Sequence, residues 1–235
     1  MQLSPEMTTL SILTIGFVLG LQHAVEADHL AAVSTIVSEK KNLFAASIVG
    51  GMWGLGHTIS LFVVGLVVIF LKLQISTEVA GKLEAIVGGM LVLLGLNAMR
   101  KLFSAEKFHV HIHEHGEREH VHLHTHESEN VGGSHHRFSP RSIAIGMVHG
   151  LAGSGALMFL ILPVIQSSIV ALLYILIFGI GSIGGMMVMS ILIGLPFHFT
   201  ATRFDFLNKG FRLVAGIFSL GLGLLIIYEK LLATA

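Results

Sequence analysis

Six long apolar segments, separated mostly by short polar connections, run along the chain. A membrane-spanning helix needs about 17–25 predominantly apolar residues at a rise of about 1.5 Å per residue, and these segments reach or exceed that length. They predict an all-α integral membrane protein with six transmembrane helices. The predicted spans are residues 8–37, 44–71, 83–99, 142–165, 169–195 and 211–228.

One long polar insertion, residues 103–140, interrupts this pattern and divides the chain. It separates a first set of three spans, within residues 1–102, from a second set of three, within residues 141–235. Because the insertion has too few apolar residues to form a packed core, we expect it to be disordered or weakly ordered.

The two sets of spans are weakly similar in register. Residues 20–23 (Gly-Leu-Gln-His) align with 146–149 (Gly-Met-Val-His), and 54–57 (Gly-Leu-Gly-His) align with 179–182 (Gly-Ile-Gly-Ser). Since each set has three spans, the second enters the membrane from the opposite side. The similarity therefore predicts an inverted 3+3 repeat, which in transporters puts the substrate site near the midplane. Chance matching of glycine-rich apolar helices is the alternative.

Basic residues are distributed unequally between the two sides of the predicted bundle. Eleven lysines and arginines follow spans one, three and five, against three on the opposite side. Because basic residues favour the cytoplasmic side, we predict a multi-pass cell-membrane protein with the insertion in the cytoplasm and both termini outside. Over the whole chain Lys+Arg 14 and Asp+Glu 14 cancel, so no basic field indicates a nucleic-acid partner.

The first span contains four ionisable side chains within seven residues, in the order His23, Glu26, Asp28, His29. Each costs about 2.5–3.5 kcal/mol near a bilayer centre, so such groups mark substrate or ion pathways. Imidazole with carboxylate suits nickel, cobalt or zinc. On a straight helix at about 100° per residue, Asp28 and His29 point away from His23. We therefore predict that the span is broken between Gly20 and Asp28; a tilted continuous helix is the alternative.

A second intramembrane histidine, His57, lies at the middle of the second span. It either binds metal with the first-span motif or hydrogen-bonds across a helix interface, and the neighbouring motif favours the first reading because such groups are seldom unpaired. The repeat partner of the His23 motif keeps a histidine, His149, but has Ser154 in place of Asp28. We predict that this second-half motif either supports a metal ligand as its hydrogen-bond partner or lines the pathway, without being a primary ligand. The predicted pathway residues are His149, Ser154, Ser182 and Thr58.

The polar insertion holds ten of the fifteen histidines. Alternating imidazoles present several nitrogens to one ion, so we predict that the insertion binds and buffers metal, which is a weaker claim than a need for it in transport. These residues are His109, His111, His113, His115, His120, His122, His124, His126, His135 and His136. The sequence has no cysteine, which excludes disulfides, thiolate metal sites and cysteine nucleophiles.

The spacing His23-x4-Asp28-His29 resembles the signature of the nickel/cobalt transporter superfamily (NiCoT/NicO). The short chain and the segment that begins at His149 resemble its UreH-like branch, which is linked to urease maturation, and Gly-His57-Thr is similar to the family's second conserved membrane element. The resemblance implies transport of Ni²⁺, with Co²⁺ as a second substrate, through the three motif residues and His57. Relatives often have aspartate where this chain has Glu26, which leaves the metal preference open.

These features together predict a Ni²⁺ permease, with Co²⁺ as a second substrate, that supplies nickel enzymes such as urease. The predicted metal site is formed by His23, Asp28 and His29, with contributions from His57 and Glu26. We expect no catalytic residue, no enzymatic activity and no catalytic cofactor, because the metal is cargo. One alternative is an exporter, for which a cytoplasmic histidine insertion is equally suitable. Another is a membrane metal sensor or an accessory protein that hands nickel to a maturation complex, and an intramembrane metalloenzyme is a remote third.

Overall fold

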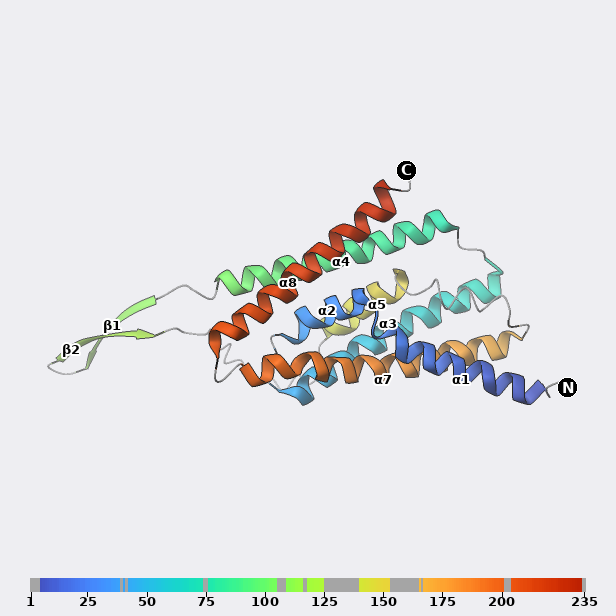
Figure 1. Ribbon diagram of the computed structural model, residues 1–235, viewed down its shortest axis with the longest axis horizontal. Coiled ribbons are helices and arrows are strands. Elements are labelled where there is room, and N and C mark those ends of the chain that lie inside the picture. The colour runs from blue at the N-terminus through green and yellow to red at the C-terminus, as the bar shows by residue number, and fades with distance from the viewer. Residues whose placement is uncertain are drawn as a thin grey trace.

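The computed structural model describes residues 5–38, 40, 42–73, 76–104, 109–115, 118–124, 140–152, 165, 167–200 and 204–233. Within these residues the chain forms a bundle of α-helices with one β-hairpin (Figure 1). The helices are α1 (Pro5–His23), α2 (Ala27–Val37), α3 (Leu43–Leu71), α4 (Thr77–Ser104), α5 (Pro140–Ala152), α7 (Ser168–Thr200) and α8 (Asp205–Ile227), which a π-helical turn, η2 (Tyr228–Leu232), continues. The hairpin strands are β1 (His109–His115) and β2 (Arg118–His124).

The helices have the dimensions and the polarity of membrane spans. Among the described residues, α3, α4, α7 and α8 with η2 are each long and apolar enough to cross a bilayer, and α1 and α2 together form a fifth, bent candidate. Large apolar side chains such as Leu93, Ile169 and Phe199 are exposed on the outside, whereas Ser182, Ser190 and four histidines are buried inside. This reversal of the usual polarity fits lipid as the surrounding solvent. The chain is a multi-pass membrane protein.

The predicted fourth span, residues 142–165, is not established by the described residues. Its helix α5 has 13 residues, which at about 1.5 Å each is well short of a hydrocarbon core about 30 Å thick. The following residues, 153–164, lie outside the described part. The structure therefore supports four spans, or five with the bent pair, where the sequence predicts six.

Several helices extend beyond the spans that apolar runs predict. Polar pairs support the extra turns: Glu78 with Lys82 at 2.6 Å in α4, and Asp205 with Lys209 at 3.2 Å in α8. Such i,i+4 pairs stabilise helix in water, where counting apolar residues gives no signal. Helix α7 likewise continues through Pro196 to Thr200.

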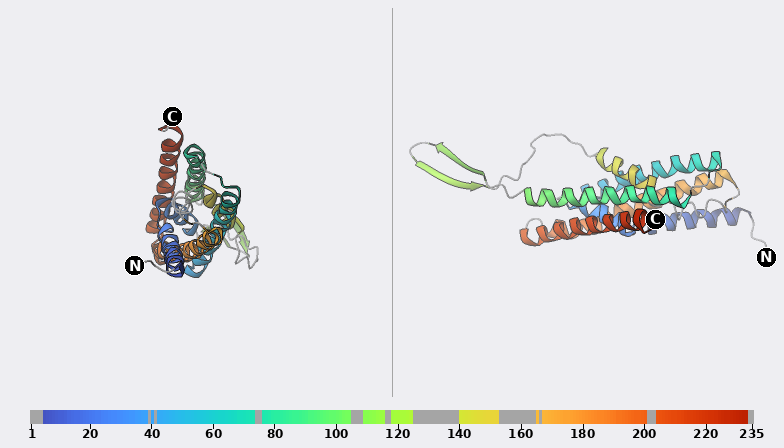
Figure 2. Two further views of the ribbon diagram at one scale, coloured as in Figure 1. Left: turned by 90° about the vertical axis from the view of Figure 1, so that its right-hand side faces the viewer. Right: turned by 90° about the horizontal axis from the view of Figure 1, so that it is seen from above.

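The helices pack in pairs that join distant parts of the sequence. Helix α3 packs against both α7 and α5, α1 packs against α7, and α4 packs along α8. Polar side chains bridge these pairs: Ser60 Oγ donates to the Met147 carbonyl at 2.8 Å and Ser219 Oγ donates to the Leu91 carbonyl at 2.9 Å. Hydroxyl bonds of this kind are typical of helix contacts in membranes. The hairpin projects from one end of the bundle and the N-terminus lies at the other, while α8 runs away from the hairpin end (Figures 1 and 2).

The hairpin corrects the expectation that the whole polar insertion lacks order. Strands β1 and β2 pair antiparallel, and their register sets His109 opposite His124, His111 opposite His122 and His113 opposite His120. Histidines alternate there with residues such as Val and Ile, and a period of two is the pattern of a β-strand. The same period presents the imidazoles that predict metal binding. His126, His135 and His136 lie outside the described residues.

Candidate metal centre

The first span breaks at the metal motif. Helix α1 ends at His23 and α2 begins at Ala27, and the two axes differ by 54°. Two backbone bonds close the turn between them, from the Val25 N–H to the Gln22 carbonyl at 3.0 Å and from the Glu26 N–H to the His23 carbonyl at 3.1 Å. The predicted break is confirmed, and the alternative of a tilted continuous helix is wrong. Because the turn changes the direction of the chain, residues that a straight helix would place on different sides can face one point.

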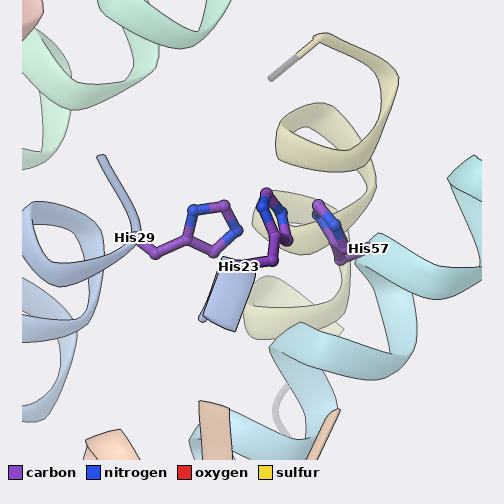
Figure 3. Close-up of side chains that lie close together, drawn as sticks. All are labelled: His23, His29 and His57. Atoms are coloured by element: carbon purple, nitrogen blue, oxygen red, sulfur yellow. The ribbon is translucent and has the colours of Figure 1, made fainter. Parts of the chain in front are cut away.

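Four histidine rings meet at this break, each 0–1% exposed. His23 ends α1, His29 lies in the first turn of α2, His57 is the central residue of α3, and His149 lies in the last turn of α5. The centroid of the His29 ring lies 4.2 Å from that of His23 and 4.1 Å from that of His149. The ring centroids of His23 and His57 are 5.1 Å apart. Figure 3 shows the His23 ring between those of His29 and His57. The cluster lies halfway along α3, at mid-depth of the bundle.

Asp28 joins two of these rings. Its Oδ1 is 2.9 Å from His29 Nδ1 and 2.8 Å from the His29 backbone nitrogen, and its Oδ2 is 3.0 Å from His149 Nε2. An ionised carboxylate only accepts hydrogen bonds, so both rings donate. Asp28 also lies in the first turn of α2, where the helix dipole favours a negative charge. The break therefore supplies the local field that a carboxylate inside an apolar bundle needs.

Other ring nitrogens of His23, His29 and His149 are buried without a hydrogen-bond partner among the described residues. With His29 Nδ1 bonded to Asp28, its Nε2 is buried and has no hydrogen-bond partner among the described residues. His23 Nε2 and His149 Nδ1 are buried in the same way. A histidine whose second nitrogen is held by a carboxylate is the usual arrangement of a metal ligand. Orphaned buried nitrogens otherwise cost about 1–3 kcal/mol each, so their grouping fits a site built for a cation.

The donors fall into two overlapping groups whose ligand atoms lie within 4.8 Å of one another. The first is His23, His29 and His57, and the second is Asp28, His29 and His149. Imidazole and carboxylate donors without thiolate suit borderline divalent ions such as Ni²⁺, Co²⁺ and Zn²⁺. The donor set therefore fits the cargo that the sequence predicts.

Glu26 lies at the edge of this centre. Its side chain is 36% exposed, and its Oε1 is 2.9 Å from His23 Nδ1 without hydrogen-bond geometry. Its position in the turn between α1 and α2 makes it the motif residue most open to the surroundings.

Two aromatic side chains enclose the centre, and the sequence reasoning gave neither a role. The Trp53 ring lies 5.1 Å from His29 and 5.4 Å from His149, and the Phe178 ring lies 5.5 Å from His23. Trp53 precedes His57 by one helical turn, which places both on one side of α3. That spacing is the sequence feature from which a contact of Trp53 with the metal centre could have been predicted. Phe178 comes from α7, and nothing local in the sequence indicates its contact.

The remaining predicted pathway residues are placed as follows. Thr58 Oγ1 donates to the Gly179 carbonyl at 3.3 Å, which joins α3 to α7. Ser182 is buried in α7, and its Oγ has no hydrogen-bond partner among the described residues. Ser154 lies outside the described part of the chain. His198, to which the sequence gave no role, is in the last turn of α7.

The fold and this site define a class: a multi-pass membrane protein with a buried imidazole–carboxylate centre at mid-depth of its helix bundle. The chain is 40% identical over 225 residues to "Urease accessory protein UreH" of Bacillus sp. (strain TB-90), covering 94% of this chain and 92% of that protein. The chain belongs to the UreH family, which confirms the resemblance to the UreH-like branch of the nickel/cobalt transporter superfamily.

A more distant relative is the Arabidopsis thaliana "Chloroplast protein FOR GROWTH AND FERTILITY 2". It is 25% identical over 216 residues, which cover 92% of this chain but 55% of that protein, so the chain spans about half the length of that relative. No protein-family profile and no solved structure matches the chain.

Proposed function

We propose that the chain is a permease for Ni²⁺, with Co²⁺ as a second substrate, that takes up nickel for enzymes such as urease. The observation that carries the proposal is the cluster of four buried histidines and Asp28 at a helix break halfway through the bundle. Ionisable groups at this depth are costly unless they serve a pathway. The relation to a protein named as a urease accessory protein supports nickel as the metal.

The permease is built as an inverted repeat of two three-helix units, residues 1–102 and 141–235, with residues 103–140 as the insertion between them. Reciprocal contacts support this. A Cβ at Gly20 would meet the Phe178 carbonyl oxygen, and a Cβ at Gly146 would meet the Trp53 carbonyl oxygen. Gly20 aligns with Gly146, and Trp53 aligns with Phe178. Each unit thus packs the start of its motif against the equivalent point of the other unit.

Transport follows from this arrangement without covalent chemistry. Trp53 and Phe178 lie against the histidine rings, and the metal binds to neutral imidazole nitrogens oriented by Asp28. Movement of one unit against the other opens the centre to one side of the membrane at a time. Because ligand nitrogens must be unprotonated to bind, protons leave or shift as the metal enters.

Experiments in proteoliposomes test whether the chain transports Ni²⁺, and experiments in cells test whether it imports or exports the metal. We expect the purified full-length chain to pass Ni²⁺ into liposomes that contain a metal-quenched dye, at a rate absent from empty liposomes. In cells, raised ⁶³Ni²⁺ content on expression supports uptake, and lowered content supports the exporter. Unchanged cellular nickel and no liposome flux, with impaired urease metallation on deletion, would instead support an accessory role.

We predict that the hairpin end of the bundle faces the cytoplasm, as the distribution of basic residues indicates. The chain lacks cysteine, so single-cysteine variants report position cleanly. Ser76→Cys precedes α4 at one end, and Phe103→Cys lies near its other end, exposed. We expect a membrane-impermeant maleimide to label Ser76→Cys in intact cells and Phe103→Cys only after permeabilisation. The reverse result would invert the topology, and labelling of both in intact cells would show that α4 does not span the membrane.

A further inference from the structure

We propose that the centre offers the metal two alternative positions that share His29, and that only the second depends on contact between the two halves of the chain. This inference rests on the proposed transport function and gives the path of the metal inside the site. It starts from the two donor groups, His23, His29 and His57 on one side and Asp28, His29 and His149 on the other.

The first position is formed by the first half of the chain alone. His23 ends α1, His29 begins α2 and His57 is in α3, and Figure 3 shows their rings side by side. The His29 ring turns its outer edge toward His23, and its buried Nε2 has no hydrogen-bond partner among the described residues. All three donors are imidazoles, so this position presents nitrogen only.

The second position lies on the other side of the same ring. His29 Nδ1 and His149 Nε2 both bond to the Asp28 carboxylate, at 2.9 Å and 3.0 Å, through different oxygens. These two bonds hold the three groups around one point. His149 comes from α5, in the second half of the chain, which packs against α3. This position presents two imidazoles and one carboxylate.

Sharing one ring makes the positions alternatives. A neutral imidazole binds metal through the nitrogen that carries no proton, and two divalent ions about 5–6 Å apart across one ring would repel strongly in an apolar interior. When the metal reaches the second position, His29 Nδ1 and His149 Nε2 both exchange their bonds to Asp28 for bonds to the metal. The proton of each ring moves to its other nitrogen, His29 Nε2 or His149 Nδ1, and neither of these has a hydrogen-bond partner among the described residues.

The consequence is a coupling between metal position and the packing of the two halves. Separation of α5 from α2 removes His149 from Asp28 and destroys the second position, whereas the first position is unaffected. Metal transfer from the first to the second position therefore requires the halves to be together on this side. His149 becomes a ligand on the path, which is a larger role than the lining predicted for it from sequence.

The experiment counts imidazoles on bound Ni²⁺ by X-ray absorption, in the full-length chain with the ten insertion histidines changed to glutamine. We expect His149→Gln to retain metal with three imidazoles and an affinity within about 3-fold of the parent, since Gln still donates to Asp28. Transport should fall by about 10-fold or more, the size of effect that supporting metal residues show. We expect His57→Ala to retain metal with two imidazoles and one carboxylate.

The following outcomes would contradict the two metal positions. Loss of all metal from His57→Ala, in a protein whose melting temperature is unchanged, would overturn the second position. Normal transport by His149→Gln would show that His149 only holds Asp28 in place. If either of these results occurs while the parent protein still transports Ni²⁺, the two-position inference is refuted but the proposed transport function stands. A parent that binds no Ni²⁺ refutes the proposed function itself.

Discussion

Replacing His29 with alanine is expected to reduce Ni²⁺ transport to about 1% of the unmodified protein or less, the largest functional effect of any single change. His29 is the one residue that belongs to both donor groups, so neither group found among the described residues keeps three ligands without it. Loss of a residue that merely orients a ligand costs about 10–100-fold in metal affinity, and loss of a shared ligand should cost at least as much. The measurement is ⁶³Ni²⁺ flux into proteoliposomes at matched protein density.

His198→Ala is the matched control for this variant. His198 is also a histidine in an apolar helix, but it is exposed at the end of α7, with its ring beside Phe199 at 5.8 Å and outside the cluster. We expect its flux to stay within about 2-fold of the unmodified protein, since surface changes away from special sites have small effects. If His29→Ala folds, as judged by its melting temperature, and still transports normally, the buried cluster is not the transport site.

The break in the first span could be predicted because a straight helix cannot bring Asp28 and His29 to the side of His23. The cost of four ionisable groups inside an apolar span indicated that they serve one pathway, and a turn between Gly20 and Asp28 lets them face one point. The structure has that turn after His23. Local geometry and a solvation cost were sufficient here because all the residues concerned are close in sequence.

The bond between His149 and Asp28 could not be predicted in the same way. The two residues are 121 positions apart, and their contact depends on how α5 packs against α3 and how α2 leaves the break. The repeat alignment matched His149 with His23, which indicated a related position but not a partner. The contact of Phe178 with His23 has the same origin, since it comes from the packing of α7 on α1.

The helix ends and the hairpin were not predicted from the sequence for a different reason. Counting apolar residues detects only the part of a helix inside lipid, so the turns that carry Glu78 and Asp205 gave no signal. In the insertion, the alternation of histidines with Val and Ile is both a metal-binding pattern and a strand pattern. The metal-binding pattern alone does not predict the strands His109–His115 and Arg118–His124.

The second large effect is expected on stability, from adding one methyl group at Gly20 or at Gly146. A Cβ at either position would collide with a backbone carbonyl of the neighbouring helix, that of Phe178 or of Trp53. A backbone atom cannot turn aside as a side chain can, so the helices must separate. Overpacking of this kind costs about 1–3 kcal/mol, which equals or exceeds the gain of about 1 kcal/mol from alanine's higher helix propensity. We expect Gly20→Ala and Gly146→Ala each to lower the melting temperature in detergent, by up to about 8 °C.

The chain offers matched controls inside its own helices. At Gly89 in α4 and Gly184 in α7, an added Cβ would meet no atom within 4 Å among the described residues beyond the glycine's own stretch of helix, so alanine there should leave the melting temperature unchanged or raise it slightly. Similar losses at Gly20 and Gly146 would support the proposed inverted repeat, in which the two glycines make equivalent contacts with the Phe178 and Trp53 carbonyls. A large loss at Gly20 with none at Gly146 would mean that α5 is held loosely against α3. In that case the bond between His149 and Asp28, and the second metal position with it, would lack the rigid support that both need.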